Sequence, residues 1–123
     1  MTTQASFSKI EKELRAALRK NINTAESTED VKKFFVYAVQ ELLDKVLEGQ
    51  VRVEYEHISL APDKPEGYTL SPILLRGRHF KQVWNTSDLP HIVRRMAEFA
   101  VKRYKRLEKY PDKTEAKMYP RPG

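Results

Sequence analysis

The spacing of apolar residues predicts two helices in the first half of the chain. Over residues 8–20 apolar side chains recur at intervals of three and four, which leaves one narrow apolar stripe. Residues 21–27 are mostly polar and are expected to break the pattern. Over 31–47 the stripe is wider, so the second helix is expected to be the main core helix. Gly49 is placed to end it in a left-handed conformation.

The period then changes to two, which predicts strands. Apolar and charged residues alternate over 51–55, as in a strand with one wet face. The segment 61–67 contains two prolines and a glycine, so it is a turn. A second strand is expected over 68–75, where Pro72 favours an edge position or a bulge. Residues 79–84 are predicted as a third, short strand.

A long last helix is expected after the capping residues at 85–88, with an apolar arc that runs to Leu107. It should end near Tyr110, because Pro111 follows. The prediction is therefore an α+β domain over 1–111, with a flexible tail at 112–123. Its order is two N-terminal helices, an antiparallel meander of two or three strands, and a long C-terminal helix packed on the sheet.

The second half of this order, helix, three strands and helix, resembles that of a double-stranded-RNA-binding domain. The resemblance is one of order alone. Such domains carry a basic cluster at the start of the last helix, where this chain has Asp88, Leu89, Pro90 and His91. Family membership is therefore not inferred.

Composition predicts a cytoplasmic protein that does not enter membranes. The 123 residues include no cysteine, which excludes disulfides and thiolate chemistry. No apolar run is long enough to span a bilayer, and the first residues lack the build of a signal peptide.

The charge distribution changes this picture, because the net charge of +6 is confined to one part of the chain. Residues 1–50 carry 8 basic and 8 acidic side chains, whereas 51–123 carry 15 and 9. The segment from Arg76 to Lys109 contains 10 basic and three acidic residues. Such a concentration favours a nucleic acid, another polyanion or a small anionic ligand as partner. A solvated basic surface without a partner is the alternative.

Two groups of residues are candidates for anion binding. The first lies on the outer face of the last helix, where basic side chains could each neutralise a phosphate. Its members are Arg94, Arg95, Lys102, Lys105 and Arg106.

The second candidate group surrounds a glycine, so that the backbone could approach an anion while cations clamp it. Its members are Arg76, Arg78, His79 and Lys81, with Phe80 and Trp84 as possible stacking surfaces. Alternatively, the two arginines of this group form cross-strand pairs with Glu54 and Glu56.

Arg103 departs from the pattern of the last helix. It projects into the apolar arc, between Phe99 and Leu107. A guanidinium there must be paired or reach water. It is expected to meet Glu54, Glu56 or a backbone carbonyl of the sheet, or to line a pocket at the helix–sheet boundary.

Catalytic chemistry has little support in the sequence. The histidines are His57, His79 and His91, and none has metal-ligand spacing. Glycine-rich phosphate loops and nucleophile motifs are absent, so no metal or cofactor is predicted. An enzyme with a site near His79 is the less favoured reading. Homo-oligomeric assembly without a nucleic-acid role is the main alternative to anion binding, because six tyrosines and one tryptophan are many interface-type residues for this length.

Overall fold

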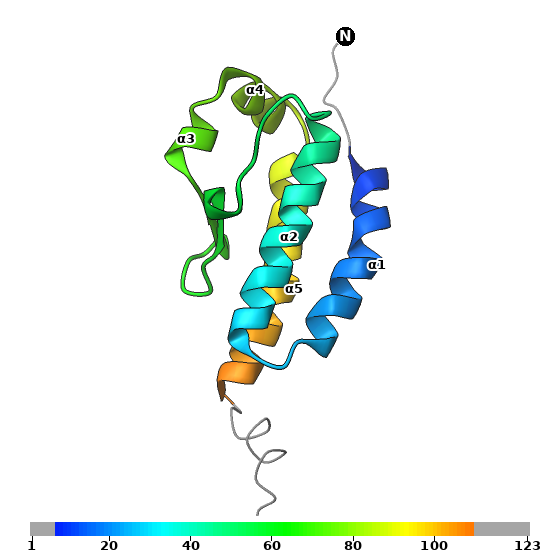
Figure 1. The fold of residues 1–123 in the computed structure, drawn as a ribbon, viewed down its shortest axis with the longest axis vertical. Helices are drawn as coiled ribbons and strands as arrows, with labels where there is room; N and C mark the ends of the chain where they lie inside the picture. The colour runs from blue at the N-terminus through cyan, green and yellow to red at the C-terminus, as the bar shows by residue number, and fades with distance from the viewer. Residues whose placement is uncertain (1–6, 110–123) are drawn as a thin grey trace, which may run out of the picture.

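Three long helices form the body of the protein in the computed structural model, which describes residues 7–109. They are α1 (Ser8–Thr24), α2 (Thr28–Val46) and α5 (Leu89–Lys109). In Figure 1, α2 and α5 overlap in the centre, with α1 on one side and a small hairpin, α3 and α4 on the other. The expected α+β class, with two N-terminal helices and a long C-terminal helix, is confirmed.

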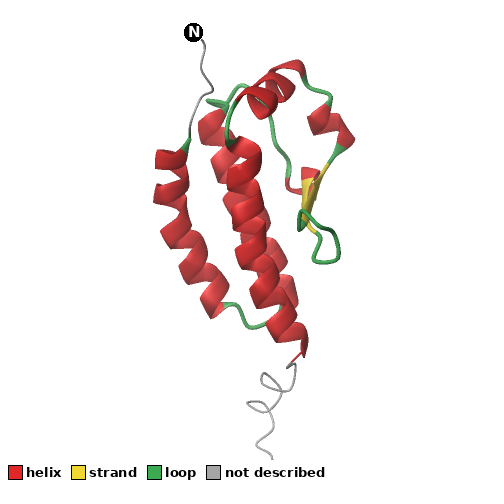
Figure 2. Ribbon diagram, turned by 180° about the vertical axis from the view of Figure 1, so that it is seen from behind, coloured by secondary structure: helices red, strands yellow, loops and turns green. Residues whose placement is uncertain are grey.

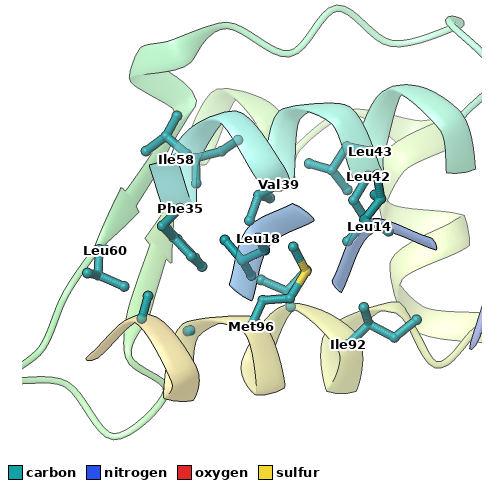
Figure 3. Close-up of a cluster of buried hydrophobic side chains, with 14 of the residues drawn as sticks. Leu14, Leu18, Phe35, Val39, Leu42, Leu43, Ile58, Leu60, Ile92 and Met96 are labelled. Carbon is teal, nitrogen blue, oxygen red and sulfur yellow. The ribbon is translucent and has the colours of Figure 1, made fainter. Parts of the chain in front are cut away.

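The core lies where α2 meets the other two long helices. Figure 3 shows Phe35, Val39 and Leu42 of α2 directed among side chains of α1 and α5, including Leu18 and Met96. The three α2 residues are completely buried. The wide stripe over 31–47 therefore marks the central helix, as expected.

Local hydrogen bonds explain the helix boundaries. Ser27 caps α2, because its hydroxyl accepts the backbone N–H of Asp30 at 3.1 Å. Gly49 has a φ of 73°, and its N–H donates to the Asp44 carbonyl, which confirms the left-handed ending. At the start of α1, the Phe7 N–H donates to Asp88 Oδ1 at 2.9 Å, which joins the first helix to the start of the last.

The sheet is a two-stranded antiparallel hairpin of β1 (Ile58–Leu60) and β2 (Tyr68–Leu70). Ile58 pairs with Leu70, and Leu60 pairs with Tyr68. The turn prediction for 61–67 is confirmed, since these residues connect the two strands.

The strand predicted over 51–55 is wrong. Residues 51–54 form no strand and lead into a short 3₁₀ turn, η1 (Tyr55–His57). Gln40 of α2 donates its side-chain amide to the Val53 carbonyl at 3.1 Å, in place of a partner strand. Val51 and Val53 pack against the core while Arg52 is exposed, so the period of two arises without a ladder.

The third strand over 79–84 and the second half of the second strand are also wrong. Residues 72–86 form two helices, α3 (Pro72–Leu75) and α4 (Arg78–Thr86). Pro72 occupies the first turn of α3, where its missing N–H has no consequence, and Ser71 caps it by accepting the Ile73 N–H. The loss of the third strand also removes the resemblance in element order to double-stranded-RNA-binding domains.

Helix α5 packs mainly on α1 and α2, with β1 and α4 as further neighbours, rather than on the sheet alone. The predicted tail at 112–123 lies outside the described residues. Within residues 7–109, no helix has the length and apolar character needed to cross a membrane.

Candidate anion-binding trough

A surface hollow of about 720 Å³ lies over the outer side of α5. One wall is α1 and the other is the hairpin loop at 61–67, which lie on opposite sides of α5 in Figure 2. We call it the α5 trough. Its cationic lining comprises Arg15, Arg19, Lys64, Arg95, Lys102 and Lys105, and its acids are Glu11, Glu66 and Glu98.

Gly67 sets the position of the hairpin wall. Its φ is 85°, and a Cβ built there would lie 3.2 Å from Cβ of Ala97 and 3.4 Å from Cγ2 of Val101. Only glycine therefore lets this backbone lie against α5 without displacement. Within the loop, the Gly67 N–H donates to the Lys64 carbonyl at 3.0 Å, which holds Lys64 in the wall.

One end of the trough is fixed by an ion pair between its two helices. Arg95 of α5 donates from Nε and Nη2 to the two carboxylate oxygens of Glu11, each at 2.8 Å. Arg15 approaches the same carboxylate at 3.4 Å. The hydrogen bond from Arg95 holds the pKa of Glu11 below its ordinary value, although burial opposes the shift. Arg95, expected as an anion contact, is therefore engaged by an internal carboxylate.

The remaining cations of the trough are not neutralised in this way. Lys64, Lys102 and Lys105 have no carboxylate within 4.0 Å in the described part of the chain. The Arg19 guanidinium lies over the Phe99 ring, 5.7 Å from its centroid. None of these four cations forms an ion pair with a carboxylate of the described residues.

Most of the lining surface is nevertheless apolar. Phe99 and Val101 of α5, both half-buried, contribute carbon atoms, as do the two prolines of the hairpin loop. Leu18 and Met96 also line the trough but are only 3% and 4% exposed. The trough thus combines apolar and cationic lining residues.

Arg76, Arg78 and Lys81 of the second predicted group line a separate hollow of about 550 Å³. Its other lining residues are Gln82, Asn85 and Thr86 of α4, which carry no charge. The structure thus brings three predicted residues together, whereas His79 is exposed and does not line the hollow.

The cross-strand pairs considered for Arg76 and Arg78 are not formed. Glu54 instead pairs with Arg52, with 2.6 Å between Nε and Oε2. Residues 76 and 78 lie at the ends of short helices rather than in a strand beside Glu54, so the geometry assumed for those pairs does not exist.

Phe80 cannot serve as a stacking surface for a ligand, because it is completely buried. Its ring stacks on that of Trp84 with 5.3 Å between centroids, and Trp84 meets the Tyr68 ring edge-on at 6.5 Å. Burial, helped by the charge of Glu66, raises the pKa of the Tyr68 hydroxyl. This cluster anchors α4 to the hairpin.

Arg103 has a different partner from those expected. Its Nη2 donates to the backbone carbonyl of Ala25, between α1 and α2, at 2.8 Å, while its Nε is buried without a partner. The expectation of Glu54, Glu56 or a sheet carbonyl was wrong, because α5 turns this residue towards the helix pair. Arg94 and Arg106 lie exposed on α5, and Arg94 approaches Glu98 at 3.8 Å.

Sequence reasoning missed Glu11, Arg15, Arg19 and Lys64. For Glu11 a signal existed, since it lies on the apolar stripe between Phe7 and Leu14. Within residues 7–109, no cluster of three or more His, Cys, Asp or Glu residues could hold a metal ion. No protein-family model, curated protein or solved structure matches the chain, so the geometry alone informs its function.

Proposed function

We propose that this protein is a binding module for an anionic ligand and that the α5 trough is its binding site. The observation that supports this most directly is the convergence of Lys64, Lys102 and Lys105 on one hollow without carboxylate partners. Cations that share a concave surface raise the local concentration of anions.

The distribution of acids around the trough strengthens the proposal. Of the three acids in the lining, Glu11 is engaged by Arg95, and Glu98 lies 3.8 Å from Arg94. Glu66 forms no ion pair among the described residues and offsets one of the cations. The cations lining the trough outnumber its acids by six to three, so the site keeps a positive potential. Lysine can bind a phosphate group as a compact point charge.

The experiment is a titration of the ¹⁵N-labelled protein, at low and at raised salt, with pyrophosphate, heparin and single-stranded RNA. We expect amide shifts at Lys64, Lys102 and Lys105 that weaken with salt. The variant K102E/K105E should lose these shifts. The control K33E/K45E, which carries the same charge change on exposed positions of α2, should retain most of them. If none of the three probes shifts trough residues at low salt, the proposal is wrong.

Self-association is a second candidate function, and exposed apolar side chains favour it. Ile73 is 63% exposed and Leu75 39%, both on α3. Tyr37 and Tyr55 form an exposed edge-to-face pair with 5.7 Å between centroids. Sedimentation velocity at micromolar concentration tests this candidate. A monomer for the wild type, or a dimer that survives I73D, would count against this surface.

A further inference from the structure

We infer that the ligand of the α5 trough is a small organic anion with an apolar body, rather than an inorganic anion or a nucleic-acid backbone. This inference rests on the proposed function and specifies the chemistry of the ligand. It follows from three properties of the trough: its lining, its size and the fixed position of its walls.

The lining offers both apolar side chains and cationic groups to a ligand. Phe99 and Val101 of α5, both half-buried, and the two prolines of the hairpin loop supply apolar side-chain surface, whereas Leu18 and Met96 are almost completely buried. The charges of the lining stand at the ends of long lysine and arginine side chains. A ligand with a single anionic group could contact Lys102 or Lys105 while its body covers the apolar surface. A fully hydrated polyanion would leave that apolar surface in water. Burial of apolar surface is the main source of affinity in such sites.

The size of the trough supports the same class of ligand. Its volume of about 720 Å³ lies within the range of roughly 300–1,000 Å³ that is typical of sites for small organic molecules. A phosphate ion would fill only a small part of it.

The walls are held before any ligand binds. The Glu11–Arg95 pair joins α1 to α5, and Gly67 seats the hairpin loop directly on α5. Pro62 and Pro65 restrict the backbone of that loop. A site of fixed shape favours a compact ligand, because little ordering is required on binding.

The test compares octyl phosphate, kept below its micelle concentration, with inorganic phosphate and with 1-octanol, by NMR titration. Octyl phosphate should bind at least about tenfold more tightly than inorganic phosphate, the gain expected from burying about two methylene groups. It should also bind more tightly than octanol, which has no charge.

Two variants separate the roles of body and charge. V101T, which replaces a methyl group of the lining with a hydroxyl, should weaken octyl phosphate several-fold and leave inorganic phosphate unchanged. Val51→Thr, at another half-buried valine that does not line the trough, is the control. K102E/K105E should weaken both phosphates. Thermal unfolding of each variant shows whether it remains folded.

The outcomes distinguish this inference from the proposed function. If octyl phosphate binds no more tightly than inorganic phosphate, or if octanol matches it, the inference is wrong while anion binding can still stand. Binding of RNA, or of anionic phospholipid vesicles, without binding of monomeric octyl phosphate would also overturn it. If no anion binds at low salt, the proposed function itself is wrong.

Discussion

Arg95 and Glu11 are 84 residues apart in the sequence, yet they form a two-point ion pair that fastens α5 to α1. The carboxylate is the buried partner, since the Glu11 side chain is 5% exposed and that of Arg95 is 51% exposed. Removal of Arg95 would therefore leave a buried charge with little compensation, whereas removal of Glu11 would leave an arginine that reaches water.

Replacement of Arg95 by methionine should destabilise the protein by about 2 kcal/mol, because it leaves a buried carboxylate with only Arg15 nearby. The double variant E11L/R95M should recover most of this loss, since it removes both charges from the interface. R94M is the control and should cost less than about 0.5 kcal/mol, because its contact with Glu98 is exposed. Urea denaturation measures all three. A double variant no more stable than R95M would contradict the explanation.

The same pair predicts how stability depends on pH. The pKa of Glu11 is lowered in the folded protein, so its ion pair contributes fully above the ordinary carboxyl pKa of about 4.3. That contribution is lost as the pH falls through the lower pKa of the folded state. The difference in unfolding free energy between wild type and R95M should therefore be full at about pH 7 and shrink below about pH 4. A difference that is constant between these values would show that Glu11 does not titrate with folding.

The three long helices could be predicted because each has a sustained period of three and four, and because α2 and α5 begin after capping serines, Ser27 and Ser87. The segment at 51–55 could not be distinguished from a strand. Its alternation comes from Val51 and Val53 packing on the core, and nothing local shows that no partner strand exists. The helix α4 is short, and one buried residue, Phe80, was too little to reveal its period.

The candidate site could be predicted only in part. Lys102 and Lys105 lie on one face of a predictable helix, so their proximity follows from the sequence. Lys64 joins them through the fold of the hairpin loop against α5, a tertiary contact without a local signal. Glu11 and Arg103 share one informative feature, a charge placed within an apolar stripe, and in each case the structure supplies a hydrogen-bond partner from another part of the chain.

For Arg103, two effects should nearly cancel. Its hydrogen bond to the Ala25 carbonyl is stabilising, whereas its buried Nε has no partner. Arg103→Met should therefore change stability by less than about 1 kcal/mol. Amide hydrogen exchange at residues 25–27 should become faster, because the connection between α1 and α2 loses its tie to α5. Arg106→Met, at an exposed neighbour, should change neither quantity. A loss of 3 kcal/mol or more for Arg103→Met would mean that its charge is better compensated than these contacts indicate.

Phe80 is expected to be structural. Phe80→Ala should cost roughly 3–5 kcal/mol, the range for a fully buried aromatic ring. It should also shift the fluorescence of Trp84, the single tryptophan, towards longer wavelength, because the stacked ring that shields it is removed. Tyr55→Ala, at an exposed ring, should cost far less. A stable Phe80→Ala protein with impaired anion binding would instead show that Phe80 contributes to the binding site.

Substitution of Gly67 should affect both the stability of the protein and the shape of the trough. Comparison with Gly49 separates backbone strain from steric overlap with α5. Both glycines have positive φ, so alanine at either position should cost about 1 kcal/mol through backbone strain. At Gly49 a new Cβ meets nothing within 4 Å, whereas at Gly67 it would approach Ala97 at 3.2 Å. Gly67→Ala should therefore cost about 1 kcal/mol more than Gly49→Ala, through overpacking.

Gly67→Ala should also weaken pyrophosphate and octyl phosphate binding, because the loop that carries Lys64 is pushed away from α5. Denaturation and NMR titration of both variants provide the measurement. Equal losses of stability, together with unchanged binding in Gly67→Ala, would mean that the close approach of this loop to α5 does not shape the site.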